Sequence, residues 1–180
     1  HKYSELPNSE ALEMTYYGAT VIHPKTIKPL QNLNIPLLVK PFMFPSEEGT
    51  AINGTAKVCS DFPSIIVKNK QVLSSFSRKD FSFITEDHLS EIFKAFADVN
   101  LKINMMQNSA LSFSVCFDAD DTKFKKLTQI LEGGYKIKYN QNLQLVTIRH
   151  YNFESINNLS AGKTVLIEQL SRNTAQLVLK

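Results

Sequence analysis

The chain lacks several features that mark whole classes of protein. Its 180 residues include no tryptophan, six glycines and two cysteines. The cysteines, Cys59 and Cys116, show no CxxC or Cys/His spacing, which argues against a disulfide scaffold or a structural zinc site and favours a reducing compartment. The apolar runs are much shorter than the roughly 20 residues that a membrane span needs, and no secretory leader is visible. We therefore expect a cytoplasmic protein that does not enter a membrane.

A basic stripe is also missing. Twenty Lys and Arg residues nearly balance seventeen Asp and Glu residues, which leaves a net charge of +3. Proteins that grip a phosphate backbone gather cations on one face, so nucleic acid is not an expected partner. With 43% hydrophobic and 21% charged residues, the composition is that of a globular protein with room for one or two domains.

The first third of the chain combines helices with one strand. Cap residues and Gly18 predict a helix over 8–19, and Pro24 at a first-turn position predicts a second helix over 24–33. Prolines at either end suggest the limits of a strand over 35–42. Residues 43–64 are rich in Pro, Gly and Ser, so we place a domain boundary there.

Beyond the boundary, strands and amphipathic helices alternate. Two short strands are predicted at 65–67 and 72–76. Apolar periodicity then predicts a helix over 85–98, strands over 101–106 and 111–118, a helix over 121–132 and a strand over 135–140. From Val72 the order is strand, helix, strand, strand, helix, strand, which is a ferredoxin-like α+β unit.

The last 38 residues resemble an abbreviated second unit. Strands are predicted at 143–151, 164–169 and 174–179, and the polar link over 152–162 is too short for a full helix. The spare strand at 65–67 would complete this half-copy, which would insert the first ferredoxin-like unit into the second.

Other chemistry-bearing residues form no recognisable constellation. Asp118, Asp120 and Asp121 lie between a strand and a helix, where turn and cap roles explain them better than a metal site. His23, His88 and His150 share no motif, so structural or surface roles are favoured over catalysis. We expect no catalytic residue and no metal ligand.

One group of polar residues has the composition of a ligand site. The helix that opens at Thr85 and includes His88 offers free backbone N–H groups, which can hold a carboxylate. In a ferredoxin-like unit the end of the next strand lies near this helix start. Here that strand ends in a run with amide and hydroxyl side chains, namely Asn104, Gln107, Asn108 and Ser109. Such groups suit the α-amino end of a small zwitterion such as an amino acid. Polar residues are also common in any loop, so this alternative stays open.

Three segments carry a resemblance to a known family. They are Glu13-Met14-Thr15-Tyr16-Tyr17-Gly18-Ala19-Thr20-Val21-Ile22-His23-Pro24, Ile35-Pro36-Leu37-Leu38-Val39-Lys40 and Gly49-Thr50-Ala51-Ile52. Together they resemble aspartate kinase (aspartokinase), in which this region closes an α/β amino-acid-kinase domain and two ACT regulatory domains follow. The resemblance implies a kinase remnant with linker at 1–63, a first strand of the second ACT unit at 64–71, a first ACT domain at 72–142 and a truncated second ACT domain at 143–180.

The resemblance also implies a function for the parent enzyme. That enzyme would use ATP and Mg²⁺ to phosphorylate L-aspartate to 4-phospho-L-aspartate, in lysine, threonine and methionine biosynthesis. The phosphate-loop and aspartate-binding parts of the family are absent here, so this chain alone would be inactive and would hold no cofactor. Thr20 and Val21 match positions that reach ATP in the parent.

The regulatory part would be a homodimer that contacts its own kinase domain and binds a small amino-acid effector, lysine or threonine, between ACT domains. The family's effector positions match Ser82, Thr85, His88, Leu89, Asn104 and Ser109, with Gln107 and Asn108 beside them. Asn104 stands where lysine-sensitive relatives have Asp, which leaves threonine open. Two alternatives remain at this point: a structural ACT dimerisation module without an effector, and a freestanding ACT sensor. A bifunctional kinase–homoserine dehydrogenase parent is also open.

Overall fold

The computed structural model describes residues 3–57 and 62–180. Cys59 therefore lies outside the described residues. The chain divides into two compact units: unit 1 comprises residues 1–66 and 148–156, and unit 2 comprises residues 67–147 and 157–180. The elements in chain order are β1 (Glu5–Pro7), α1 (Asn8–Tyr17), α2 (Pro24–Asn32), β2 (Leu37–Val39), β3 (Thr50–Asn53), β4 (Ser64–Arg78), α3 (Glu86–Asp98), β5 (Ile103–Asn108), β6 (Phe113–Asp118), α4 (Asp121–Leu131), β7 (Tyr135–Arg149), α5 (Phe153–Ser160), β8 (Val165–Leu170) and β9 (Thr174–Leu179).

Unit 1 contains a small sheet with two helices. Its strand order is β1-β3-β2, with β1 parallel and β2 antiparallel to β3. The core of this unit consists of Leu6, Ala11, Ile27 and Ile52, each almost fully buried. The two predicted helices and the predicted strand are confirmed as α1, α2 and β2. Strands β1 and β3 are additional, and each is only three or four residues long.

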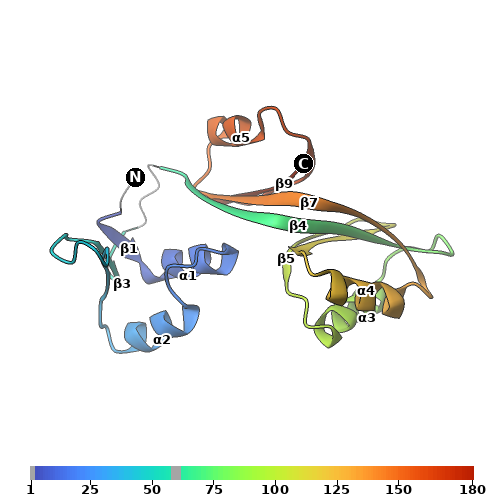
Figure 1. The fold of residues 1–180 in the computed structure, drawn as a ribbon, viewed down its shortest axis with the longest axis horizontal. Coiled ribbons are helices and arrows are strands. Elements are labelled where there is room, and N and C mark those ends of the chain that lie inside the picture. Colours follow the sequence, from blue (N-terminus) through green and yellow to red (C-terminus); the bar gives the residue numbers. More distant parts are fainter. Residues whose placement is uncertain (1–2, 58–61) are drawn as a thin grey trace. The chain divides into compact units, whose positions relative to one another are not determined.

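Unit 2 is built on an antiparallel sheet whose six strands follow the order β5-β6-β4-β7-β9-β8. Figure 1 shows α3 and α4 beside one another below the β4 to β7 part of this sheet. Their apolar faces bury Ile92, Phe96, Leu127 and Leu131 against β4, β6 and β7. Phe96 and Phe117 meet edge to face at 5.4 Å within this core. The alternation predicted at 111–118 is confirmed, because Phe113, Val115 and Phe117 all face this core.

Two pairs of predicted short strands are single long strands. The structure has β4 where strands at 65–67 and 72–76 were predicted, and β7 where strands at 135–140 and 143–151 were predicted. Lys70 and Asn142 interrupt them with φ values of 54° and 57°. Ile137 packs on the helix-covered core, whereas Leu143, six residues later, belongs to a second cluster with Leu73. The left-handed Asn142 thus shifts the alternation of β7, so that side chains after it point to the opposite face of the sheet while the strand continues.

The polar link over 152–162 is a helix, which corrects the sequence prediction. Residues 153–160 form α5. Asn152 caps it, because its Oδ1 accepts the Ser155 N–H at 2.7 Å while the Ser155 hydroxyl donates to the Asn152 carbonyl at 2.7 Å. Eight residues with two such capping bonds are enough for two turns, although the segment has few large apolar residues.

Candidate functional site

The Gly-Ala-x-Val-x-His-Pro motif forms the connection between α1 and α2. Gly18 ends α1 in the left-handed region with a φ of 118°, and the Ala19 N–H donates to the Met14 carbonyl at 2.9 Å. His23 caps α2, since its Nδ1 accepts the Lys25 N–H at 3.2 Å, and Pro24 occupies the first helical position. The motif's Gly, His and Pro are therefore explained by helix termination and capping.

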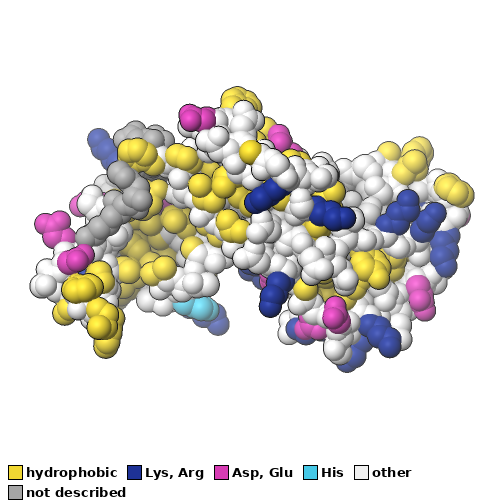
Figure 2. All heavy atoms as spheres, turned by 45° about the horizontal axis from the view of Figure 1, so that its top comes forward, with side chains coloured by type: hydrophobic (Ala, Val, Ile, Leu, Met, Phe, Trp, Pro, Cys, Tyr) yellow, Lys and Arg dark blue, Asp and Glu magenta, His cyan; other side chains and the backbone are white. Residues whose placement is uncertain are grey.

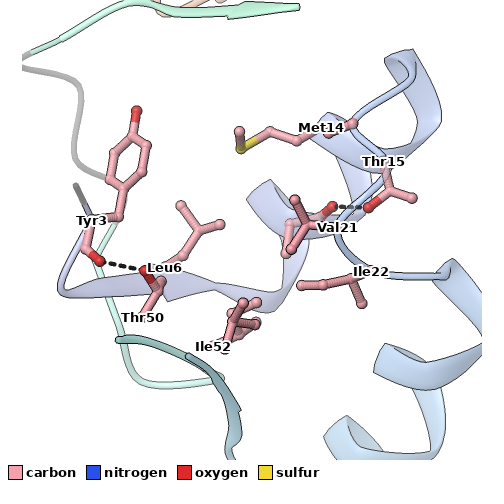
Figure 3. Close-up of a pocket in the computed structure, with 11 residues that line it drawn as sticks. Tyr3, Leu6, Met14, Thr15, Val21, Ile22, Thr50 and Ile52 are labelled. Carbon is pink, nitrogen blue, oxygen red and sulfur yellow. Dashed lines mark hydrogen bonds between the residues drawn. The ribbon is translucent and has the colours of Figure 1, made fainter. Parts of the chain in front are cut away.

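Thr20 and Val21 lie between these caps and are both exposed. Val21 lines an apolar cavity of about 160 Å³ in unit 1, shown in Figure 3 with Leu6, Met14, Ile22 and Ile52 around it. The hydroxyls at this cavity are already satisfied, because Thr15 donates to the Ala11 carbonyl and Thr50 to the Tyr3 carbonyl. No lining residue carries a charge. The contact with ATP that the resemblance assigns to Thr20 and Val21 stays a prediction.

Unit 1 also contains a buried ion pair that the sequence did not reveal. The Arg149 guanidinium donates to both Glu10 carboxylate oxygens, at 3.0 and 2.6 Å. The His150 Nε2 lies 3.2 Å from the same carboxylate, and Glu13 lies 3.7 Å from Arg149 at the exposed side. Burial raises the Glu10 pKa, but the bonds and charge from Arg149 outweigh it and leave that pKa below its ordinary value. Glu10 and Arg149 are 139 residues apart, so no local pattern could have paired them.

The predicted juxtaposition of the α3 N-terminus with the end of β5 is present in unit 2. The Ile84 N–H, just before α3, donates to the carbonyl of Ala110, just after β5, at 2.9 Å. Thr85 caps α3 together with His88, whose Nδ1 accepts the Thr85 N–H at 3.1 Å. Leu89 is partly buried against the helix-covered core. The structural role favoured for His88 is thus confirmed.

Hydroxyl and amide side chains surround this junction. The Ser109 hydroxyl bonds to the Ser112 carbonyl at 3.0 Å and closes the turn between β5 and β6. Ser82 donates both its N–H and its hydroxyl to Asp80, at 3.0 and 2.7 Å, which organises the loop before α3. Gln107 and Asn108 are exposed on β5. The junction therefore presents several solvent-facing donors and acceptors from two elements.

Asn104 does not lie at this junction. It is five residues before Ser109 on β5, which corresponds to roughly 15 Å of extended strand. Its amide donates to Gln71 at 2.9 Å and accepts from Lys68 at 2.8 Å. Gln71 and Lys68 also bind Asp118, at 2.7 and 3.2 Å. Burial raises the Asp118 pKa, but these bonds and the Lys68 charge leave it below its ordinary value. Asn104 thus serves a closed network in this single chain.

Metal-binding groups are not gathered in the described part of the chain. No cluster of three His, Cys, Asp or Glu side chains is present there. Asp120 caps α4 by accepting the Lys123 N–H at 3.0 Å, which confirms its predicted cap role.

Among residues 3–57 and 62–180, no helix combines the length and apolar character required to cross a bilayer.

Comparison with known proteins identifies related sequences. The chain is 31% identical over 140 residues to the chloroplastic bifunctional aspartokinase/homoserine dehydrogenase 2 of Zea mays. That match covers 74% of this chain and 15% of the relative. It is also 29% identical over 122 residues to the chloroplastic aspartokinase 1 of Arabidopsis thaliana, which covers 67% of this chain and 21% of the relative. The chain therefore spans only about a fifth or less of these relatives. No protein-family model matches it.

Solved aspartokinase structures share its fold. Clostridium acetobutylicum aspartate kinase, described as an allosteric enzyme, superposes with a TM-score of 0.84 at 18% identity, over 99% of this chain and 45% of that one. Escherichia coli aspartokinase III superposes with TM-scores of 0.78 in a complex with aspartate and ADP and 0.75 in a complex with lysine and aspartate. A C-terminal regulatory domain of aspartate kinase from Porphyromonas gingivalis superposes at 0.56 and is 86% covered. The chain belongs to the aspartokinase family, and 66% of it shares the fold of a C-terminal regulatory domain from that family.

Proposed function

We propose that this region is an allosteric module that binds an amino acid and transmits its presence to the kinase domain of a parent aspartokinase. The observation that carries the proposal is the junction between the α3 N-terminus and the end of β5. There, exposed amide and hydroxyl groups surround a helix start, which suits a carboxylate and an α-amino group. The effector set would be Ser82, Thr85, His88, Leu89, Gln107, Asn108 and Ser109, without Asn104, whose amide is bonded to Gln71 and Lys68.

The architecture supports the assignment of ACT domains. The run β4-α3-β5-β6-α4-β7 has the ferredoxin-like order, and both helices cover one face of its four strands. The first half of β4 and the second half of β7, together with β8 and β9, would form the second, abbreviated ACT unit, with α5 as its helix. We assign unit 1 to the end of an amino-acid-kinase domain, because the motif that resembles that domain lies entirely within it.

We propose that two copies associate along β5. This strand is an edge of the sheet, so its outer backbone groups are free to pair. Beside it, Phe83, Phe93 and Met106 expose 67%, 38% and 49% of their surface. These three residues form what we call the edge surface. Exposed apolar side chains next to an unpaired edge strand favour association with a second copy.

The parent enzyme would phosphorylate aspartate with ATP and Mg²⁺. The Escherichia coli relative was solved with aspartate and ADP and also with lysine and aspartate, which supports a substrate and an amino-acid effector of these kinds. Effector binding would favour one arrangement of the dimer that disfavours the active kinase. The coupling is reciprocal, with a typical size of about 1–3 kcal/mol.

Thermal unfolding of the 180-residue chain with lysine, threonine or methionine tests the effector. A ligand at 100 times its Kd adds about 2.7 kcal/mol to the free energy of unfolding. For a chain of this size we expect a Tm increase of roughly 5 to 10 °C with one amino acid. Gln107→Ala should abolish the increase, whereas Gln129→Ala on the exposed side of α4 should leave it intact.

The outcome separates the effector site from a purely structural module. If no amino acid raises the Tm of a folded, dimeric sample, the region is a dimerisation module without an effector. If the Tm rises equally in Gln107→Ala and in the unmodified chain, the amino acid binds elsewhere. Either result would overturn the assignment of the α3–β5 junction as the effector site.

A further inference from the structure

Unit 2 contains a cavity whose chemical character differs from that of the proposed amino-acid site. Its volume is about 510 Å³, which is room for a small organic molecule. The lining residues come from the end of β4, the loop before α3, the β5–β6 turn and the start of β7. They are Ser77, Arg78, Lys79, Phe81, Ser82, Leu111, Ser112, Lys136 and Lys138. We call it the basic cavity.

Positive charge dominates the basic cavity. Four of its nine lining residues are cationic and none is acidic. Lys136 and Lys138 are two positions apart on β7 and therefore share one face of the strand. Within the described part of the chain, no ion pair is seen for Lys79, Lys136 or Lys138. Figure 2 shows Lys and Arg side chains gathered beside hydrophobic ones at the end of unit 2 that lies to the right.

The fourth cation is held in place by its surroundings. The Arg78 guanidinium lies over the Tyr135 ring at 5.4 Å and donates to Asp80 at 3.1 Å. A side chain at Gly134 would press against it, because a Cβ there would lie 2.9 Å from Arg78 Nη1. Asp80 is also the acceptor for Ser82, so the same carboxylate fixes both a cation and a hydroxyl of the cavity. Because Arg78 is already held in place, a ligand that binds it loses less free energy to the ordering of that side chain.

Hydroxyl groups complete the polar lining. Ser77, Ser82 and Ser112 each contribute one, on three different segments. Ser77 donates to the Lys136 carbonyl at 3.4 Å, Ser82 donates to Asp80 at 2.7 Å, and the Ser112 hydroxyl bonds to that of Ser109 at 2.9 Å. The ammonium groups are therefore the donors for an oxyanion, and the hydroxyls make the lining polar. Phe81 and Leu111 expose 87% and 51% of their surface at the same cavity and supply an apolar wall.

We propose that the basic cavity binds an organic polyanion, a small metabolite with a phosphoryl group or several carboxylates. Three unpaired ammonium groups and a positioned guanidinium do not suit lysine, whose side chain is itself cationic. The charge pattern instead suits a ligand with at least two negative charges. The cavity shares Ser82 with the proposed effector set, whereas its four cations, Arg78, Lys79, Lys136 and Lys138, lie outside that set.

Calorimetric titration of the 180-residue chain tests the proposal, with pyrophosphate and citrate as probes of the phosphoryl and the carboxylate chemistry. At about 20 mM salt we expect a Kd below about 1 mM for one of them, and weaker binding at higher ionic strength. Lys136→Gln/Lys138→Gln should weaken it at least tenfold, because each lost bond is charge-assisted. Lys28→Gln/Lys126→Gln removes the same charge away from the cavity and should change the Kd less than twofold.

Two results would overturn the proposal: neither probe binds the unmodified chain, or the two double variants lose affinity equally. The second would mean that only the general field of the protein attracts the anion. NMR offers a readout that needs no variant. The probe that binds should shift the amide resonances of Ser77, Ser82 and Ser112, and unchanged resonances there with shifts elsewhere would also overturn the site.

Discussion

Glu10 is the residue whose removal we expect to cost unit 1 most. Its buried carboxylate holds Arg149 through two bonds, so Glu10→Gln would leave the guanidinium buried without its counter-charge. Breaking such a pair from one side costs about 3–5 kcal/mol of the free energy of unfolding. Glu13→Gln is the matched control, because Glu13 is half exposed and lies 3.7 Å from the same arginine. It should cost less than about 1 kcal/mol. Urea denaturation measures both, and equal losses would contradict the importance of burial.

The same carboxylate should give the chain an acid-sensitive stability. The folded-state Glu10 pKa lies below its ordinary value of 4.5, so the ionised form favours the folded state. That stability is fully present above pH 4.5 and is lost as the pH falls through the folded-state pKa. The Tm difference between the unmodified chain and Glu10→Gln should therefore shrink below about pH 4.5. A difference that stays constant from pH 7 to pH 3 would show that the charge of Glu10 contributes nothing.

Residue patterns predicted local roles better than long-range partners. The caps at Thr85 and Asp120 follow from a polar residue before an amphipathic run, and both are present. The Glu10–Arg149 pair and the Asn104 network depend on contacts between distant segments, which no local pattern encodes. Asn104 was grouped with Ser109 because both belong to the polar run at the end of a predicted strand and both match effector positions of the family. The five residues of extended strand between Asn104 and Ser109 place their side chains too far apart for one site.

At the scale of elements, α4 should depend on the buried half of its surface. Leu127 is fully buried in the core beneath the sheet, whereas Ile130 on the same helix is 51% exposed. Leu127→Ala should lower the free energy of unfolding by about 2–5 kcal/mol. Ile130→Ala removes similar apolar volume from the exposed side and should cost less than about 1 kcal/mol. Denaturant titrations compare the two, and similar costs would contradict the packing of α4.

Element boundaries were predictable where caps and periodicity agree, and not where a left-handed residue stands within a strand. Asn142 lies between the two strands predicted at 135–140 and 143–151. The chain instead adopts a positive φ at that single residue and stays in the sheet, because neighbouring strands continue to pair on both sides. Helix α5 was missed since its capping is supplied by Asn152 and Ser155, with little apolar periodicity to announce it.

For the whole molecule, the order of elements was sufficient to predict a ferredoxin-like unit with a second unit wrapped around it in sequence. The small strands of unit 1 were not predictable, because β1 and β3 are three and four residues long and become strands only by pairing with each other. The basic cavity was equally hidden. Lys79 and Lys136 are separated by 57 positions, so its charge is visible only after folding.

The assembly of the whole molecule gives a final prediction. If two copies pair along β5, a charge at the edge surface would be buried in the dimer, once from each copy. Met106→Glu should therefore convert the dimer to a monomer, with at least a tenfold weaker dimer Kd, since a buried unpaired charge is costly. Sedimentation velocity over a range of concentrations measures this, and circular dichroism shows that the variant is folded. Ile130→Glu, on the exposed side of α4, is the matched control and should leave the dimer intact. A Met106→Glu chain that still sediments as a dimer would place the interface elsewhere and remove β5 from the proposed assembly.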